Sequence, residues 1–120
     1  IVCLSIPTFL FTFSKVMKGY MSFLIGRDIW VSFITEMELL AFEGHSEAEM
    51  KTIKTFLSHC KIVDINRSIK EAAIDIRRVD KVKLPDAIVA ATSHYLNVPL
   101  ITADKDFKAV TRIVSAIIDL

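Results

Sequence analysis

From Ile29 onward, short runs of β-branched and aromatic residues alternate with segments of helical periodicity, and this alternation limits the possible folds most strongly. Such an order predicts right-handed crossovers, a mostly parallel sheet and helices on both of its faces, which is an α/β fold. The length of 120 residues suits one compact domain, so we expect a single domain over residues 1–120. Ligands of such sheets bind outside the carboxyl ends of the strands.

The periodicity also predicts where the individual elements lie. Strands are expected at residues 29–35, 62–65, 99–102 and 113–118, and helices at 36–42, 68–79, 84–96 and 105–110. A further helix is expected after Ser46, because Glu49 completes a capping box with it and apolar residues follow on one face. That face consists of Met50, Ile53, Leu57 and Cys60. The buried stripe of the 68–79 helix is predicted to be Ile69, Ala72, Ala73, Ile76 and Val79.

The first 13 residues carry no charge and have some features of a signal peptide. They lack a basic leading region, and Lys15 and Lys18 stand where a cleavage site would belong. The segment is shorter than the ~20 residues that span a bilayer, and Pro7 interrupts it. We therefore expect a buried first strand here and no membrane role.

Composition excludes several other classes. A net charge of +1 leaves no polybasic tail, so nucleic-acid binding would need a local patch. The two cysteines, Cys3 and Cys60, make neither a disulfide scaffold nor a zinc site, which favours a reducing, cytoplasmic setting.

Acidic residues follow the ends of predicted strands. Glu36 and Glu38 come after the 29–35 strand, and only one of them can point into a common site because they are two apart on a helix. Asp104 and Asp106 come after the 99–102 strand, and Asp86 opens the apolar helix. Taken singly, Asp86 could be a helix cap and the other four could be solvated loop charges.

As a set, these carboxylates suggest a metal site. Several carboxylates at one edge of a sheet repel each other unless a cation lies between them. Hard oxygen ligands without His or Cys favour Mg²⁺ or Mn²⁺ over zinc, and such a site can support hydrolysis of a phosphodiester. His45, His59 and His94 are scattered without metal-ligand spacing and are expected on the surface or on helix faces.

Three segments, at residues 35–40, 83–92 and 100–107, together resemble a PIN domain, and most closely the VapC-type toxins of toxin–antitoxin pairs. The resemblance runs from about Met21 to the end of the chain, and it is the order and spacing of the three motifs that make it specific. It implies a three-layer α/β/α sandwich with a mostly parallel central sheet and a Mg²⁺ or Mn²⁺ site that cleaves RNA. It also implies a small antitoxin partner and a homodimer.

Carried over residue by residue, the resemblance assigns the catalytic and metal-binding acids to Glu38, Asp86 and Asp104, with Asp106 as a weaker fourth match. Glu36 stands at a position that the family does not require. Thr102 is expected to hydrogen-bond a ligating carboxylate or water. Basic residues near the motifs are candidates for contacts with the RNA backbone, although each could equally belong to a solvated helix face. They are Arg77, Arg78, Lys81, Lys83, Lys105 and Lys108.

The amino terminus departs from the family, which places an Asp at the end of its first strand. Ser5 stands near that position, and a neutral hydroxyl would weaken a divalent site. A reading-frame slip is one explanation, because permitted codons for residues 5–15, read one frame over, spell Asp-Ser-Asn-Ile-Leu-Ile-Tyr-Leu-Leu-Lys, which is the family's opening motif. Sequencing the DNA tests this, and codons that cannot be re-read in this way would reject it.

Aromatic residues crowd the first quarter of the chain and could promote self-association if exposed: Phe9, Phe11, Phe13, Tyr20, Phe23 and Trp30.

Three functions are therefore compared. The leading one is a metal-dependent endoribonuclease that is the toxin of a toxin–antitoxin pair. The second is a catalytically weakened relative that binds an antitoxin or RNA without efficient cleavage, which the missing first acid favours. The third, a signalling domain with one phosphoacceptor Asp, fits three acidic motifs poorly. The RNA target and the identity of the antitoxin cannot be read from the sequence.

Overall fold

The computed structural model describes residues 2–5 and 28–117. Its strands form one five-stranded sheet in the order β3-β2-β1-β4-β5, and every neighbouring pair is parallel. The strands are β1 (Val2–Leu4), β2 (Ile29–Ser32), β3 (Lys61–Val63), β4 (Leu100–Thr102) and β5 (Ser115–Ile117). The predicted parallel sheet is confirmed, and the expected first strand is its central strand. The remainder of the uncharged segment and the aromatic residues up to Phe23 lie outside the described residues.

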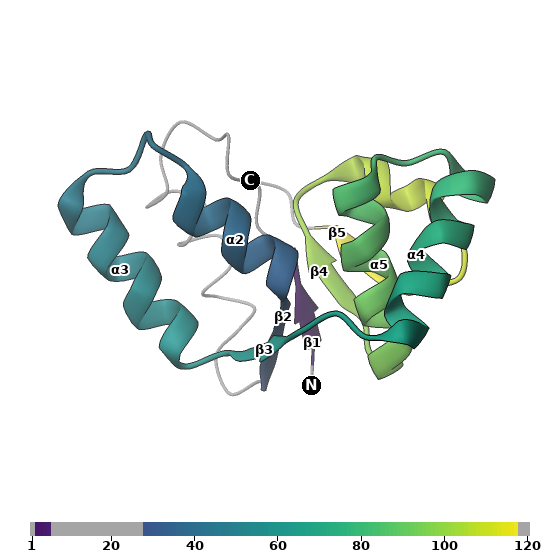
Figure 1. Cartoon of the computed structure of the whole chain (residues 1–120), viewed down its shortest axis with the longest axis horizontal. Helices are drawn as coiled ribbons and strands as arrows, with labels where there is room; N and C mark the ends of the chain where they lie inside the picture. The colour runs from purple at the N-terminus through teal and green to yellow at the C-terminus, as the bar shows by residue number, and fades with distance from the viewer. Residues whose placement is uncertain (1, 6–27, 118–120) are drawn as a thin grey trace.

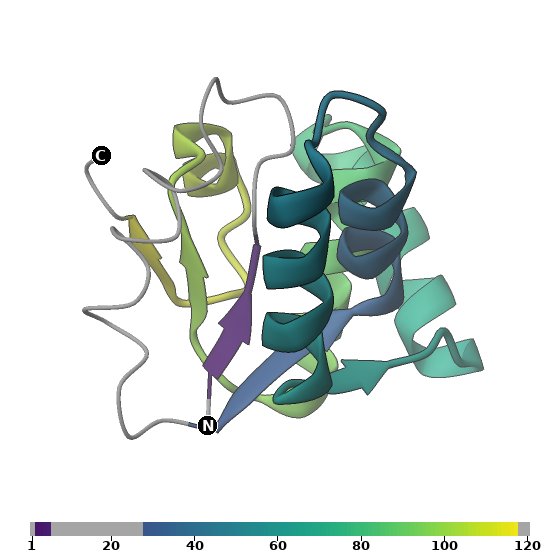
Figure 2. The same ribbon diagram turned by 90° about the vertical axis from the view of Figure 1, so that its left-hand side faces the viewer.

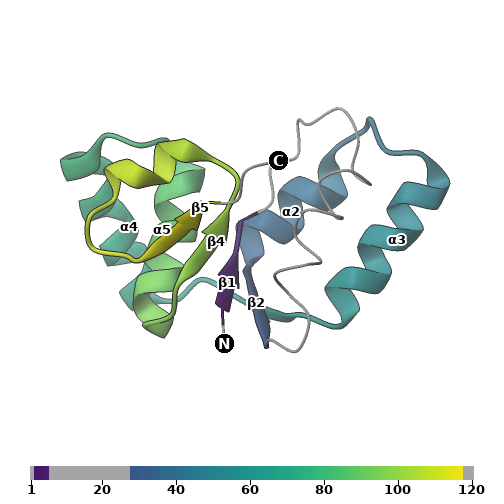
Figure 3. The same ribbon diagram turned by 180° about the vertical axis from the view of Figure 1, so that it is seen from behind.

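The helices are α2 (Phe33–Ala41), α3 (Glu47–Ser58), α4 (Arg67–Asp80), α5 (Leu84–Leu96) and the short 3₁₀ helix η1 (Lys105–Ala109). Figure 1 shows α2 and α3 on one side of the strands and α4 and α5 on the other, and Figure 3 shows the same arrangement from behind. The expected three-layer α/β/α sandwich is therefore confirmed.

Alternate residues of the strands supply the two halves of the core. Val31 and Ile101 face one side and pack in a cluster with Leu39, Ile53 and Leu57 from α2 and α3. Cys3 and Leu100 belong to the other cluster, which is built on α4, α5 and η1. The latter cluster also contains Ile69, Ala73, Ile76, Ala87, Ala90 and Phe107. Both faces of the sheet are covered, as expected for a parallel sheet.

Local capping explains where the helices begin. Ser46 and Glu49 form the predicted capping box, with the Glu49 N–H donating to Ser46 Oγ at 3.1 Å and the Ser46 N–H donating to Glu49 Oε1 at 2.9 Å. Strand β2 ends three residues earlier than predicted. Ser32 is the reason, because its hydroxyl accepts the N–H of Ile34 and so starts α2 at Phe33.

Two other predictions differ from the structure. Val79 is 69% exposed and does not belong to the buried stripe of α4. It lies about 80° around the helix from Ile69, whereas Ala73 and Ile76 follow the core-facing line. Strand β3 ends at Val63, two residues earlier than predicted, and β5 begins at Ser115, two residues later than predicted. Among the described residues, no helix is long and apolar enough to cross a membrane.

Candidate functional site

The strand order determines which loops meet at one end of the sheet. From the central β1 the chain proceeds outward through β2 and β3 on one side, and it later returns to place β4 and β5 on the other. A change of direction of this kind opens a crevice at the carboxyl ends of the two inner strands, where ligands of α/β proteins bind. Figure 2 shows η1, in yellow-green, at the end of the molecule toward which the strands point.

The loop after β4 places Asp104 and Asp106 at this edge. The hydroxyl of buried Thr102 accepts the Asp104 N–H at 3.0 Å, and Asp104 Oδ1 accepts the Asp106 N–H at 2.8 Å as the cap of η1. Thr102 therefore positions the backbone of Asp104. These two hydrogen bonds fix the loop that carries both acids.

Asp86 lies in the first turn of α5, half-buried, beside that loop. The pKa of its carboxyl is raised from 3.8 to about 6, first by burial and next by the negative charge of Asp104. Glu38 and Asp106 raise it further, while the ammonium group of Lys83 acts in the opposite direction. The helix-cap interpretation of Asp86 is wrong, because the N-cap residue of α5 is Lys83.

Glu38 reaches the same region from α2. Burial of its carboxyl raises the pKa of Glu38, although the residue as a whole is exposed. Of the two acids on α2, Glu38 is the one whose charge raises the pKa of Asp86. The charges of Glu38, Asp104 and Asp106 thus all converge on Asp86.

The four acids suit a hard divalent cation by their chemistry, since they offer carboxylate oxygens that repel one another. Within residues 2–5 and 28–117, however, no three His, Cys, Asp or Glu side chains are close enough to ligate one metal ion. The donor set therefore fits Mg²⁺ or Mn²⁺ in kind, but its side chains are not gathered into a closed ligand shell.

Ser5 follows the central strand directly. Its N–H donates to the Ile101 carbonyl at 2.9 Å, and the register of β1 with its neighbours, continued by one residue, places it between Ser32 and Thr102. Ser5 thus occupies the carboxyl end of β1, at the centre of the edge on which the acids converge. The position at which the resemblance expects an acid is therefore a neutral hydroxyl.

An open cleft of about 450 Å³ lies beside the acids. Three of the predicted basic residues line it, namely Lys81, Lys83 and Lys105, together with Asp86 and Asp106. Arg77, Arg78 and Lys108 are exposed and are not among the described residues that line this cleft. Sequence reasoning missed Asp80, which also lines it. The signal was available, because Asp80 lies four residues after Ile76 and so continues the core-facing line of α4.

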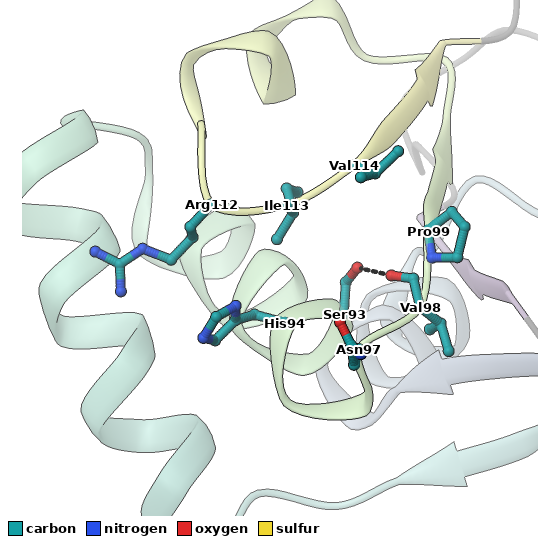
Figure 4. A pocket seen from close by; sticks show the side chains of 8 residues that line it. All are labelled: Ser93, His94, Asn97, Val98, Pro99, Arg112, Ile113 and Val114. Carbon is teal, nitrogen blue, oxygen red and sulfur yellow. Dashed lines mark hydrogen bonds between the residues drawn. The ribbon is translucent and has the colours of Figure 1, made fainter.

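A second hollow, of about 170 Å³, lies at the opposite edge of the sheet, where β4 and β5 begin (Figure 4). Its lining includes His94, Asn97 and Arg112, and the Ser93 hydroxyl donates to the Val98 carbonyl at 2.7 Å within it. No carboxylate is among the described residues that line it. This hollow is therefore separate from the acidic edge.

The other two histidines make local contacts. His45 packs edge-to-face on Phe42, with ring centroids 4.8 Å apart, and His59 Nδ1 lies 2.8 Å from the Thr55 carbonyl oxygen. None of the three histidines is among the described residues that line the cleft beside Asp86.

The PIN domain family model matches residues 12–113 of the chain. VapBC2 from Rickettsia felis, bound to a DNA fragment from its promoter, is similar in structure with TM-score 0.80 and 18% identity, over 98% of this chain and 98% of that chain. VapBC-1 from nontypeable Haemophilus influenzae matches with TM-score 0.78 and 19% identity, over 97% and 96%. A toxin–antitoxin complex from Klebsiella pneumoniae matches with TM-score 0.67 and 24% identity, over 95% and 96%. A search of curated proteins by sequence gave no significant match. The parallel sheet, the acids at its carboxyl edge and the family match over most of the chain lead to one conclusion: the chain belongs to the PIN domain family.

Proposed function

We propose that this protein is a metal-dependent endoribonuclease and the toxin of a toxin–antitoxin pair. The observation that carries the proposal is the convergence of Glu38, Asp104 and Asp106 on half-buried Asp86, where burial first and these charges next raise the pKa of Asp86 to about 6. A stable fold gains nothing from bringing four like charges together, so the arrangement is explained by a positive ligand that occupies it.

Glu38, Asp86, Asp104 and Asp106 would hold Mg²⁺ or Mn²⁺, which when bound supplies positive charge that polarises a phosphate and activates water. The chain's own contribution is positioning. Thr102 holds the Asp104 backbone, and the Asp104 cap orders Asp106, so two of the acids are fixed before any ligand arrives. Above about pH 6 Asp86 is ionised and available to a cation.

The partners follow from the family and from its similar structures. We propose that a small antitoxin binds this chain, because the similar structures include VapBC and other toxin–antitoxin complexes. A homodimer is proposed from the family resemblance of the three motifs alone. RNA is proposed as the substrate because a cation among carboxylates is suited to in-line attack on a phosphodiester.

The test compares RNA cleavage, with Mg²⁺ or Mn²⁺, by the wild type and by Asp86→Asn. The matched control is Asp75→Asn, an exposed acid on α4 outside the convergent set. We expect Asp86→Asn to lose most of its activity and Asp75→Asn to keep it. Equal rates for the wild type and Asp86→Asn would reject the proposed chemistry.

Ser5 favours a second candidate, a weakened relative that binds antitoxin or RNA but cleaves poorly. A hydroxyl at the end of β1 contributes no ligand charge, and the described acids do not form a closed ligand shell. Calorimetric titration with Mn²⁺ separates the candidates, since a defined site of micromolar affinity argues against a weakened relative. A signalling domain with one phosphoacceptor Asp is not supported, because the chain is a PIN domain with four convergent acids.

A further inference from the structure

The connection between α4 and α5 is short and rigid. Lys81 ends α4 in the left-handed conformation with φ 57°, Val82 is buried in the core, and Lys83 is the N-cap residue of α5. A non-glycine residue in that conformation is disfavoured by about 1 kcal/mol or more, and such residues are frequent at functional sites. Buried Val82 thus anchors a loop whose two exposed lysines line the cleft.

Lys105 lines the same cleft from the other side. It is the first residue of η1, directly after Asp104, whose side chain caps that helix. All three lysines therefore come from backbone that hydrogen bonds or core packing hold in place. A site built on such rigid segments loses little conformational entropy when a ligand binds.

The three ammonium groups are not paired with the acids beside them. Asp80, Asp86 and Asp106 line the same cleft. Among the described residues, however, the ion pair with its N and O atoms within 4.0 Å joins Arg67 and Glu71, and these three lysines form no such pair. If a bound cation neutralises Asp86 and Asp106, the charges that remain in the cleft are those of three lysines and of Asp80, so the cleft has a net positive charge. The lysines are then free to bind an anion next to the acidic edge.

We propose that Lys81, Lys83 and Lys105 bind the phosphate backbone of single-stranded RNA and position it beside the acids. This inference rests on the proposed function, and it selects these three lysines over the neighbouring arginines. They are positioning residues, because none of them is a candidate metal ligand. A cleft of about 450 Å³ is the size of a site for one drug-sized unit, so it can hold about one nucleotide of a single strand.

An acidic peptide fits the cleft less well. Peptides bind grooves through apolar anchors or by adding a strand to a sheet edge, and the apolar lining here is limited to Val82 and Ala109. Phosphates need little apolar surface, since their affinity comes from charge neutralisation and counterion release. The chemistry of the lining therefore favours a polyphosphate chain.

The experiment measures binding of a short fluorescein-labelled single-stranded RNA to the full chain by anisotropy, with Ca²⁺ in place of Mg²⁺ or Mn²⁺, so that a hard cation neutralises the acids, and electrophoresis verifies that the RNA stays intact. The affinity is recorded over a range of salt concentrations for the wild type and for the triple variant Lys81→Gln/Lys83→Gln/Lys105→Gln. The charge-matched control is Lys51→Gln/Lys54→Gln/Lys70→Gln, which changes three exposed lysines on α3 and the first turn of α4. Circular dichroism verifies that each variant is folded. The single variant Lys81→Arg keeps the positive charge and tests whether charge at this position is sufficient for RNA binding.

We expect the slope of log affinity against log salt to fall by about 0.7 for each lost phosphate contact, hence by about 2 in the triple variant. The control and Lys81→Arg should keep the wild-type slope. A triple variant with the wild-type slope, or competition by polyglutamate as strong as that by unlabelled RNA, would overturn the inference. Binding that depends on the lysines without any cleavage in Mn²⁺ would reject the proposed function alone.

Discussion

Replacing Asp86 with Asn should stabilise the folded protein at neutral pH, although it should abolish the proposed activity. Asp86 has its pKa raised from 3.8 to about 6, so its ionised form is less favourable in the folded chain than in the unfolded chain. A pKa rise of about 2 corresponds to about 3 kcal/mol at full ionisation. Because the side chain is only half-buried, solvent screening reduces the expected gain to about 1 kcal/mol.

The pH dependence gives this prediction its sign. Between about pH 4 and pH 6 the folded chain holds a proton on Asp86 that the unfolded chain has released, so this carboxyl lowers stability as pH rises through that window. The free energy of unfolding of Asp86→Asn should therefore exceed that of the wild type by about 1 kcal/mol at pH 7.5, which corresponds to a Tm rise of about 3 to 5 °C. The difference should shrink toward zero near pH 4.

Urea denaturation in EDTA, at pH 7.5 and pH 4.5, measures the effect. Asp75→Asn is the control and should stay within about 0.5 kcal/mol of the wild type at both pH values. Adding Mn²⁺ should stabilise the wild type by mass action and leave Asp86→Asn unchanged. An Asp86→Asn protein that is no more stable than the wild type at pH 7.5 would refute the argument that burial and the neighbouring acids disfavour the charged form of Asp86.

Three further predictions test the site and the fold. Ser5→Asp should tighten Mn²⁺ binding by at least about tenfold in calorimetry, because it adds a charged ligand at the end of β1, and unchanged affinity would contradict that placement. Glu38→Gln should weaken Mn²⁺ binding and RNA cleavage while Glu36→Gln should not, and equal losses would show that the site does not discriminate between them. Ser46→Ala should lower the free energy of unfolding by about 1 kcal/mol through loss of the capping box, as measured by urea denaturation. A change below about 0.3 kcal/mol would mean that the cap contributes little.

The order of strands and helices could be predicted because the signals are local. The capping box at Ser46, the apolar stripe containing Ile69 and Ile76, and the short helix after Asp104 each depend on residues a few positions apart. Periodicity missed one further local signal, because the Ser32 hydroxyl accepts the N–H of Ile34, two residues on, and so ends β2 early.

The sequence by itself determined that acids would follow the strand ends and which of them match the family motifs. The tertiary structure alone decided that Asp86 receives the charges of Glu38, Asp104 and Asp106, and that Ser5 follows the central strand of the sheet at its carboxyl end. The physical reason is that a pKa and a charge cluster depend on distances through space. Those distances follow from strand order and helix packing, which no short stretch of the sequence contains.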